Sequence, residues 1–252
     1  PLGHRFGYRI RNESKSSAQT RVEVVTEGVL LRRIQSDPFL EGIDVVILDE
    51  FHERSLNADL AVAFLKEIQQ EVRTDLKLLI LSATLDPAPL KRYFGASLTH
   101  LHSDGRIYPV TIEYSPPKSQ REWMDHLVEE VARLCTTDLW GHILVFLPGV
   151  KEIRWVQDRL ATHTKRNVYP LHGRLTSQQQ DNALAPSTRP KVVLSTNLAE
   201  TSVTLPNVQW VVDSGLHRTS YVKNGISRLK TEMISKDSAT QRAGRAGRTE
   251  QG

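Results

Sequence analysis

Short apolar runs alternate with longer stretches of helical periodicity along this chain of 252 residues. The runs are four to six residues long and rich in β-branched residues or leucine, which is typical of strands buried on both faces of a parallel sheet. They comprise residues 22–25, 44–48, 76–81, 143–147, 191–194 and 209–212.

Three stretches between these runs predict amphipathic helices, because their apolar residues recur every three or four positions. The expected apolar stripes are Leu60, Phe64 and Ile68 in 59–70, Trp123, Leu127, Val131 and Leu134 in 121–134, and Ile153, Val156 and Leu160 in 150–160. The alternation of strands and helices favours an α/β fold with right-handed crossover connections.

The segment 107–120 interrupts this alternation. Tyr108-Pro109 and the Ser-Pro-Pro-Lys-Ser run at 115–119 disfavour a helix and favour an extended connector. We therefore expect two domains, residues 1–114 and residues 115–252.

Composition adds little to this picture. Hydrophobic residues make up 39% and charged residues 25%, as in ordinary globular domains, and no apolar run approaches the roughly 20 residues of a membrane span. The formal net charge of +4 suits a polyanionic partner and a mixed-charge solvated surface equally well. A single Cys135 without nearby metal-ligand partners, and no signal-peptide pattern, lead us to expect a cytoplasmic protein with Cys135 buried in a helix.

Two adjacent carboxylates, Asp49 and Glu50, directly follow the buried run 45–48. The carboxyl edge of a parallel sheet is where α/β proteins bind ligands. Asp49 can hold Mg²⁺ through water, and Glu50 can orient and deprotonate a water that attacks a γ-phosphate. An acidic helix N-cap is the alternative for such a pair alone, but the preceding strand and His52 favour a site.

Residues 241–248 read Gln-Arg-Ala-Gly-Arg-Ala-Gly-Arg. On a helix Arg245 and Arg248 would share one face, and the glycines permit close backbone approach. A planar guanidinium suits phosphate and can stabilise the charge of a transferring phosphoryl group. A basic patch or a disordered Arg-Gly tail is the alternative, which the regular spacing and the opening Gln241 disfavour.

Together these motifs resemble the DEAH/RHA family of superfamily 2 helicases. The resemblance covers nearly the whole chain, and Phe51 points to its bacterial HrpB-like branch. It implies two RecA-like α/β domains with mainly parallel sheets in an ATP-dependent RNA helicase. The further matching segments are 26–32 (TEGVLLR), 82–84 (SAT), 144–149 (LVFLPG), 171–173 (LHG) and 195–204 (STNLAETSVT).

The resemblance also implies a role for each matching residue. The catalytic residues would be Glu50, His52, Gln241, Arg245 and Arg248. ATP would be bound by Asp49, Glu50, Ser202, Thr204, Gln241, Arg245 and Arg248, with Asp49 and Glu50 holding Mg²⁺ and Ser82 and Thr84 coupling nucleotide state to domain closure. The backbone of RNA, with DNA as the alternative, would be bound by Thr26, Arg32, Gly149, Thr196 and Asn197.

Two of these implied roles have ordinary structural alternatives. Thr196 and Asn197 follow the strand 191–194, where hydroxyl and amide side chains often serve as caps. Asn224-Gly225 predicts a hairpin, and the family places a hairpin that parts or guides strands at this point, so residues 221–229 would fill that role. A plain surface hairpin is the alternative.

The chain departs from the family in two places. It contains no Gly-Lys pair, and hence no phosphate-binding Gly-x-x-x-x-Gly-Lys-[Ser/Thr] loop, which the family places before Gly7. Pro206 stands where the family often has an acidic residue. We therefore expect a first domain truncated at its N-terminus, a second truncated at its C-terminal end, and poor ATP hydrolysis by these residues alone. A non-catalytic nucleic-acid-binding or regulatory fragment and a DExH DNA helicase or viral-type NTPase are the competing functions.

Overall fold

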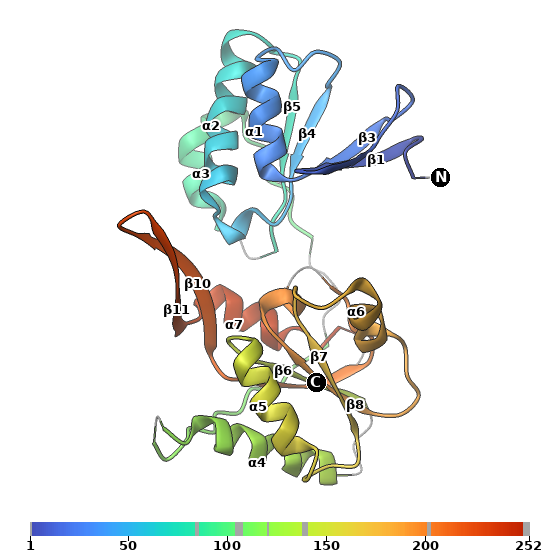
Figure 1. The fold of residues 1–252 in the computed structure, drawn as a ribbon. Helices are drawn as coiled ribbons and strands as arrows, with labels where there is room; N and C mark the ends of the chain where they lie inside the picture. Colours follow the sequence, from blue (N-terminus) through green and yellow to red (C-terminus); the bar gives the residue numbers. More distant parts are fainter. Residues whose placement is uncertain are drawn as a thin grey trace. The chain divides into compact units, whose positions relative to one another are not determined.

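The computed structural model describes residues 2–83, 86–103, 108–119, 121–137, 141–200 and 203–248. The chain folds into two compact units, residues 1–101 (unit 1) and 102–252 (unit 2) (Figure 1). Residues 108–114, which we had expected in the first domain, belong to unit 2. There the backbone N–H of Tyr108 donates to the carbonyl of Gly247 at 2.9 Å.

Unit 1 combines short, mostly parallel strands with three helices. Strand β1 pairs antiparallel with β2 and parallel with β3, and β4 pairs parallel with β5. The elements are β1 (Phe6–Ile10), β2 (Glu13–Lys15), β3 (Val22–Val25), α1 (Glu27–Ser36), β4 (Val45–Leu48), η1 (Phe51–Glu53), α2 (Leu56–Glu71), β5 (Lys77–Ile80), α3 (Pro87–Phe94) and η2 (Gly95–Ser97).

Helices cover only one face of the β4–β5 pair. Val46 and Leu48 of β4 pack with the buried faces of α1 and α2, whereas Val45 and Ile47 on the opposite face are 44% and 55% exposed. The prediction that these strands are buried on both faces is therefore wrong for the described part of unit 1. Its strands alternate, as expected where a single layer of helices covers a sheet.

The predicted stripe of α2 is also wrong in part. Leu60 and Phe64 are exposed, and the helix turns Ala58, Ala61 and Leu65 toward the core instead. Of the predicted stripe only Ile68 is buried, and it packs with Ala58, Ala61, Val62 and Leu65 in a core that also contains Leu30 and Ile34 of α1.

Unit 2 is built around a fully parallel four-stranded sheet with the order β7-β8-β6-β9 (Figure 1). The helix 150–160 and the strand pattern of β6 and β8 follow the sequence prediction closely. The elements are α4 (Trp123–Thr136), β6 (His142–Phe146), α5 (Val150–Leu160), β7 (Asn167–Leu171), α6 (Ser177–Leu184), β8 (Lys191–Ser195), η3 (Asn197–Ala199), β9 (Val208–Asp213), β10 (Leu216–Lys223), β11 (Ile226–Met233) and α7 (Lys236–Ala243).

The sheet of unit 2 is covered on both faces, as predicted. Ile143 and Val145 of β6 pack under α4 and α5, and the alternate residues Leu144 and Phe146 pack with α6 and the segment that follows β8. Every residue of β6 and β8 is buried. The predicted stripes of α4 and α5 are confirmed, except that Trp123 is only partly buried. Cys135 of α4 is also only partly buried against this core.

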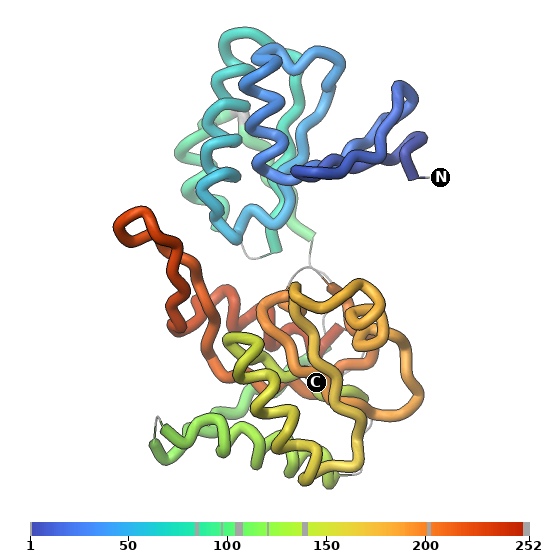
Figure 2. The backbone as a smooth tube through the Cα atoms, in the orientation of Figure 1, coloured from blue at the N-terminus to red at the C-terminus, as the bar shows by residue number. Residues whose placement is uncertain are grey.

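A long antiparallel hairpin, β10–β11, extends from unit 2 (Figure 2). Its turn is formed by Asn224 and Gly225 with φ of 53° and 73°, the positive values that a two-residue type I′ turn requires. The predicted hairpin is confirmed and is longer than residues 221–229. None of the described helices is long and apolar enough to cross a membrane.

Two buried polar residues, Lys191 and His142, begin the two central strands of this sheet, β8 and β6. The ammonium of Lys191 donates to the carbonyls of Ala183 and Ala185 at 2.6 and 2.7 Å, which satisfies the C-terminal end of α6. The backbone N–H of Lys191 donates to Nδ1 of His142 at 3.4 Å. Burial, with the charges of Lys191 and Arg166, lowers the pKa of His142.

This environment predicts acid-sensitive stability. Below about pH 6.5 the unfolded chain protonates His142 at its ordinary pKa, whereas the folded chain stays neutral to lower pH. The free energy of unfolding should therefore fall as the pH drops from 7 to 5, and it should fall less in His142→Asn, which keeps an acceptor but does not titrate. Urea unfolding can be followed by fluorescence, because all four tryptophans lie in unit 2 (Trp123, Trp140, Trp155 and Trp210).

His172 provides a second contribution that the His142→Asn variant leaves intact, because burial lowers its pKa as well. The variant should therefore reduce the pH dependence without abolishing it. An identical pH dependence in the wild type and in His142→Asn would contradict this account.

Candidate functional site

The acidic pair lies at the carboxyl end of β4, as predicted. Asp49 is exposed, and its Oδ1 accepts the backbone N–H of Glu50 at 2.8 Å. Glu50 has a φ of 52° and a ψ of 36°, a left-handed conformation that costs a non-glycine residue about 1–2 kcal/mol. The N–H of Phe51, donating to the carbonyl of Leu81 at 3.0 Å, helps to hold the chain in this turn.

His52 connects Glu50 to the end of the neighbouring strand. Its Nε2 lies 3.4 Å from Oε2 of Glu50, and its Nδ1 lies 3.3 Å from Oγ of Ser82. The tautomer with its proton on Nε2 satisfies both contacts, because it donates to Glu50 and accepts from Ser82. The predicted link between Ser82 and the acidic pair therefore runs through His52. Thr84 lies outside the described residues.

The donors at this edge suit Mg²⁺ in part. Carboxylate oxygens are the ligands that Mg²⁺ prefers, and it usually takes one or two of them together with waters and phosphate oxygens. Asp49 and Glu50 are such a pair on the surface of unit 1. Among the described residues no group of three or more His, Cys, Asp or Glu side chains is placed to hold a metal by itself.

The arginine segment begins in a helix but does not continue in one. Helix α7 ends at Ala243, and turn hydrogen bonds follow, such as that from the N–H of Arg245 to the carbonyl of Arg242 at 3.1 Å. Arg245 is 4% exposed, whereas Arg248 is exposed. The two side chains therefore do not share one helix face.

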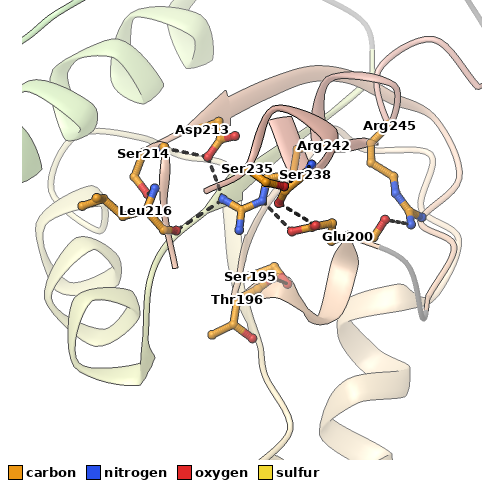
Figure 3. Close-up of polar contacts among 11 residues, drawn as sticks. Ser195, Thr196, Glu200, Asp213, Ser214, Leu216, Ser235, Ser238, Arg242 and Arg245 are labelled. Carbon is orange, nitrogen blue, oxygen red and sulfur yellow. Dashed lines mark hydrogen bonds and ion pairs between the residues drawn. The ribbon is translucent and has the colours of Figure 1, made fainter. Parts of the chain in front are cut away.

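Arg242 is the most deeply buried charged residue of this segment, with an exposed fraction of 1%. Its Nε donates to Oε2 of Glu200 and its Nη1 to Oδ1 of Asp213, both at 2.8 Å (Figure 3). The guanidinium also lies 4.7 Å from the centre of the Phe146 ring. Two carboxylates and an aromatic face thus surround one cation in the interior of unit 2.

Arg245 extends to the opposite side of Glu200 (Figure 3). Its guanidinium donates to the backbone carbonyls of Val203, at 2.6 Å, and of Glu200. In this structure Nη1 and Nη2 of Arg245 are therefore directed at the carbonyls of Val203 and Glu200, although the sequence predicted a contact with phosphate. Gln241 is partly buried.

The residues predicted to bind a nucleic-acid backbone lie in both units. In unit 1, Thr26 is the N-cap residue of α1, yet its exposed side chain makes no capping hydrogen bond, and Arg32 is exposed on the same helix. In unit 2, Thr196 precedes η3 without a side-chain cap, so capping does not explain it, and Asn197 is exposed.

Gly149 precedes α5 in an extended conformation, with a φ of −170° that any residue can adopt. A Cβ there would lie 2.5 Å from Nη1 of Arg218, so a side chain at this position would displace the Arg218 guanidinium from where it lies in this structure. Thr204 is exposed beyond η3. Ser202, predicted to bind nucleotide, lies outside the described residues.

Sequence reasoning missed Glu200 and Asp213. Glu200 also accepts a hydrogen bond from the hydroxyl of Ser238 at 2.5 Å, so it joins η3 to α7. A signal for Asp213 was present, because it ends an apolar strand just as Asp49 follows β4. Its partner, Arg242, lies 29 residues away in sequence and could not be identified from spacing.

Several known proteins resemble this chain over almost its whole length. The helicase conserved C-terminal domain matches residues 123–250. The ATP-dependent RNA helicase HrpB of Escherichia coli is 46% identical over 256 residues, covering 99% of this chain and 31% of that protein. The ATP-dependent RNA helicase HrpA homolog of Haemophilus influenzae is 37% identical over 258 residues, covering 100% of this chain and 20% of that protein.

Solved structures give the same result. The crystal structure of the Escherichia coli DEAH/RHA helicase HrpB matches with a TM-score of 0.89 and 45% identity, covering 100% of this chain and 33% of that one. This likeness confirms the predicted RecA-like α/β fold. The chain spans about a third or less of the length of these relatives.

The environment of Arg242 predicts a large loss of stability when the cation is removed. Arg242→Met leaves the carboxylates of Glu200 and Asp213 close together without their partner, which should lower the free energy of unfolding by about 3 kcal/mol. Urea unfolding followed by tryptophan fluorescence measures this change.

Neutralising the carboxylates provides the control. The triple variant Arg242→Met, Glu200→Gln, Asp213→Asn should be more stable than Arg242→Met, because it leaves no unpaired charge in the interior. A loss below about 1 kcal/mol for the single variant would show that the ion pairs do not hold this region.

Proposed function

Because this chain belongs to the DEAH/RHA family of helicases and carries the helicase conserved C-terminal domain, we propose that it works in an ATP-dependent motor that moves along RNA or unwinds it. The two helicase domains of the motor are proposed to be unit 1 and unit 2, with their boundary near residue 101 and not near residue 115 as predicted from the sequence. The observation that carries the proposal is the orientation of Glu50 beside His52 and Ser82 at the carboxyl edge of β4–β5.

Glu50 is proposed as the general base for the attacking water. Its side chain is 44% exposed, so water reaches the carboxylate, while its backbone is fixed in a strained turn. Strain at a functional position is a common feature of active sites. His52 is proposed to orient the carboxylate of Glu50, and Ser82 to link His52 to the end of β5.

Asp49 and Glu50 are the residues that would hold Mg²⁺ with its waters, and the ion would neutralise charge on the phosphate oxygens of ATP. Gln241, Arg245 and Arg248 are proposed to bind those phosphates, and Ser202 and Thr204 to lie near the nucleotide. Exposed Arg248 can do so directly. Arg245 must first exchange the Val203 carbonyl for a phosphate oxygen, an exchange that a guanidinium permits because it donates in a planar fork.

RNA is proposed to lie against Thr26 and Arg32 of unit 1 and Gly149, Thr196 and Asn197 of unit 2. Thr26, Arg32 and Asn197 are exposed, Thr196 is partly buried and Gly149 is buried. Hydroxyl, amide and guanidinium groups bind phosphates and sugars without reading bases. The hairpin β10–β11 is proposed to meet the same strand. Its outer half exposes Val222, Ile226 and Leu229 at 72%, 59% and 62%, which suits contact with unstacked bases.

Glu50→Gln tests the chemistry. In the protein that carries this chain, RNA-stimulated ATP hydrolysis should fall roughly 10²–10⁴-fold, because general-base catalysis contributes about that much. Steady-state phosphate release measures the rate. Binding of RNA should stay unchanged, because Glu50 is not proposed to contact it.

Glu71→Gln is the matched control, since it removes an exposed carboxylate from the end of α2 in the same unit. Its activity should equal that of the wild type. If Glu50→Gln retained most of the activity, Glu50 would not be the base. If a folded wild type bound RNA without hydrolysing ATP, a non-catalytic RNA-binding function would explain the protein better than the motor would.

Arg32→Gln tests the binding of the RNA backbone. It should weaken the binding of two unrelated single-stranded RNAs to the same extent, and it should lower the slope of log K against log salt by about 0.7. Fluorescence anisotropy at several salt concentrations measures both quantities.

Arg33→Gln is the control on the next residue of α1. Its guanidinium already pairs with Glu23 at 2.7 Å, so its removal should change the salt slope less. Equal slopes for Arg32→Gln and the wild type would remove Arg32 from the interface.

A further inference from the structure

The hairpin β10–β11 is tied to α5 by an ion pair at its root. Nη2 of Arg218, in β10, lies 2.8 Å from Oε1 of Glu152, in α5, across 66 residues of sequence. The two side chains are 28% and 17% exposed, so the pair is largely shielded from water. We refer to Arg218 and Glu152 as the root pair.

Gly149 makes room for this pair. Besides its close approach to Arg218, a Cβ at Gly149 would lie 3.0 Å from Oε2 of Glu152. The root pair therefore lies directly against the backbone of Gly149, at the start of α5. Any movement of Arg218 changes the packing around a residue that is proposed to bind RNA.

Two further hydrogen bonds hold the start of β10 and the residues before it. The carbonyl of Leu216 accepts a hydrogen bond from Nη1 of Arg242 at 3.3 Å, and the N–H of Ser214 donates to the carbonyl of Phe146 at 3.2 Å. The base of the hairpin is thus fixed both to the arginine segment and to the start of α5. An isolated two-stranded ribbon is only marginally stable, so the direction of its tip depends on these contacts at its base.

We propose that Arg218 is a positioning residue for strand separation, which holds the hairpin at a fixed angle to the loop at Gly149 through its ion pair with Glu152. This inference rests on the proposed function. RNA bound at Gly149 and bases meeting the hairpin tip are kept in register by the root pair. ATP hydrolysis itself does not require the pair, because neither residue contacts the acidic edge or the phosphate-binding arginines in the described structure.

A direct contact of Arg218 with RNA phosphate is the alternative, and Glu152 distinguishes the two. If Arg218 binds phosphate, Glu152→Gln frees its guanidinium and strengthens RNA binding. If the root pair positions the hairpin, Glu152→Gln and Arg218→Gln remove the same interaction and have the same effect.

The experiment measures unwinding of a short RNA duplex and RNA-stimulated ATP hydrolysis in the protein that carries this chain. Arg218→Gln and Glu152→Gln should each slow unwinding about fivefold, the effect of an interaction of about 1 kcal/mol, with ATP hydrolysis changed less than about twofold. The double variant should be no slower than either single variant, because the interaction is lost only once.

Arg133→Gln is the matched control. Arg133 is exposed on α4 and pairs with Glu130 at 2.9 Å, so the variant removes an equal charge and an ion pair without affecting the root pair or the hairpin. It should unwind at a rate close to that of the wild type. Slowing as large as in Arg218→Gln would mean that the loss of one positive charge, and not the loss of a fixed root, slows unwinding.

Hydrogen exchange of residues 216–233 provides a readout that does not depend on activity. Both root-pair variants should exchange faster there than the wild type, and the control should not. Unchanged exchange and unwinding in an active protein would overturn the inference alone. A wild type that neither hydrolyses ATP nor unwinds RNA would refute the proposed function, and faster exchange in the two variants would still establish the root pair as the anchor of the hairpin.

Discussion

The arrangement of the elements in unit 2 depends on the buried guanidinium of Arg242. Arg242 is shielded from water almost completely, and an unpaired charge in such a place would be prohibitively unfavourable. Glu200 and Asp213 remove that penalty, and each belongs to a different part of the chain, the segment after β8 and the end of β9. The cation therefore forces α7, η3 and the root of the hairpin to adopt one arrangement. The end of the arginine segment, residues 244–248, takes its position from this arrangement, because Arg245 donates to the carbonyls of Glu200 and Val203.

The parallel direction of the strands brings the other candidate site residues together. In parallel sheets all carboxyl ends lie at one edge, so residues distant in sequence gather there without any local signal. Asp49 follows β4, and Ser82 lies just beyond β5. In unit 2, Thr196 follows β8 and Asp213 ends β9 in the same way. Buried strands thus provide a rigid base, and short turns present the polar groups, which is how a fold keeps functional side chains in place without burying them.

The same reasoning explains how much could be predicted from the sequence. Strands β6 and β8 are buried along their whole length, so a continuous apolar run defines them, and the apolar stripe of α5 is buried as its period predicts. For α2 the apolar period predicted the wrong buried face in part, because alanines carry little hydrophobic signal but allow close helix packing. It also missed β7 and α6, which are short and partly polar. The acidic pair and the arginines were found because their motifs are local, whereas the partners of Arg242 depend on tertiary structure.

The hairpin shows why tertiary contacts matter more than motifs here. Its turn was predicted from Asn224-Gly225, but a turn says nothing about where a ribbon points. Direction is set at the base, where Leu216 contacts Arg242 and Arg218 contacts Glu152. One of these contacts belongs to the arginine segment and the other to the start of α5. A rearrangement of the arginine segment would therefore act on the strand that also carries Arg218, and the hairpin would respond both to Arg242 and to the start of α5 through Leu216 and Arg218, which are two positions apart on β10.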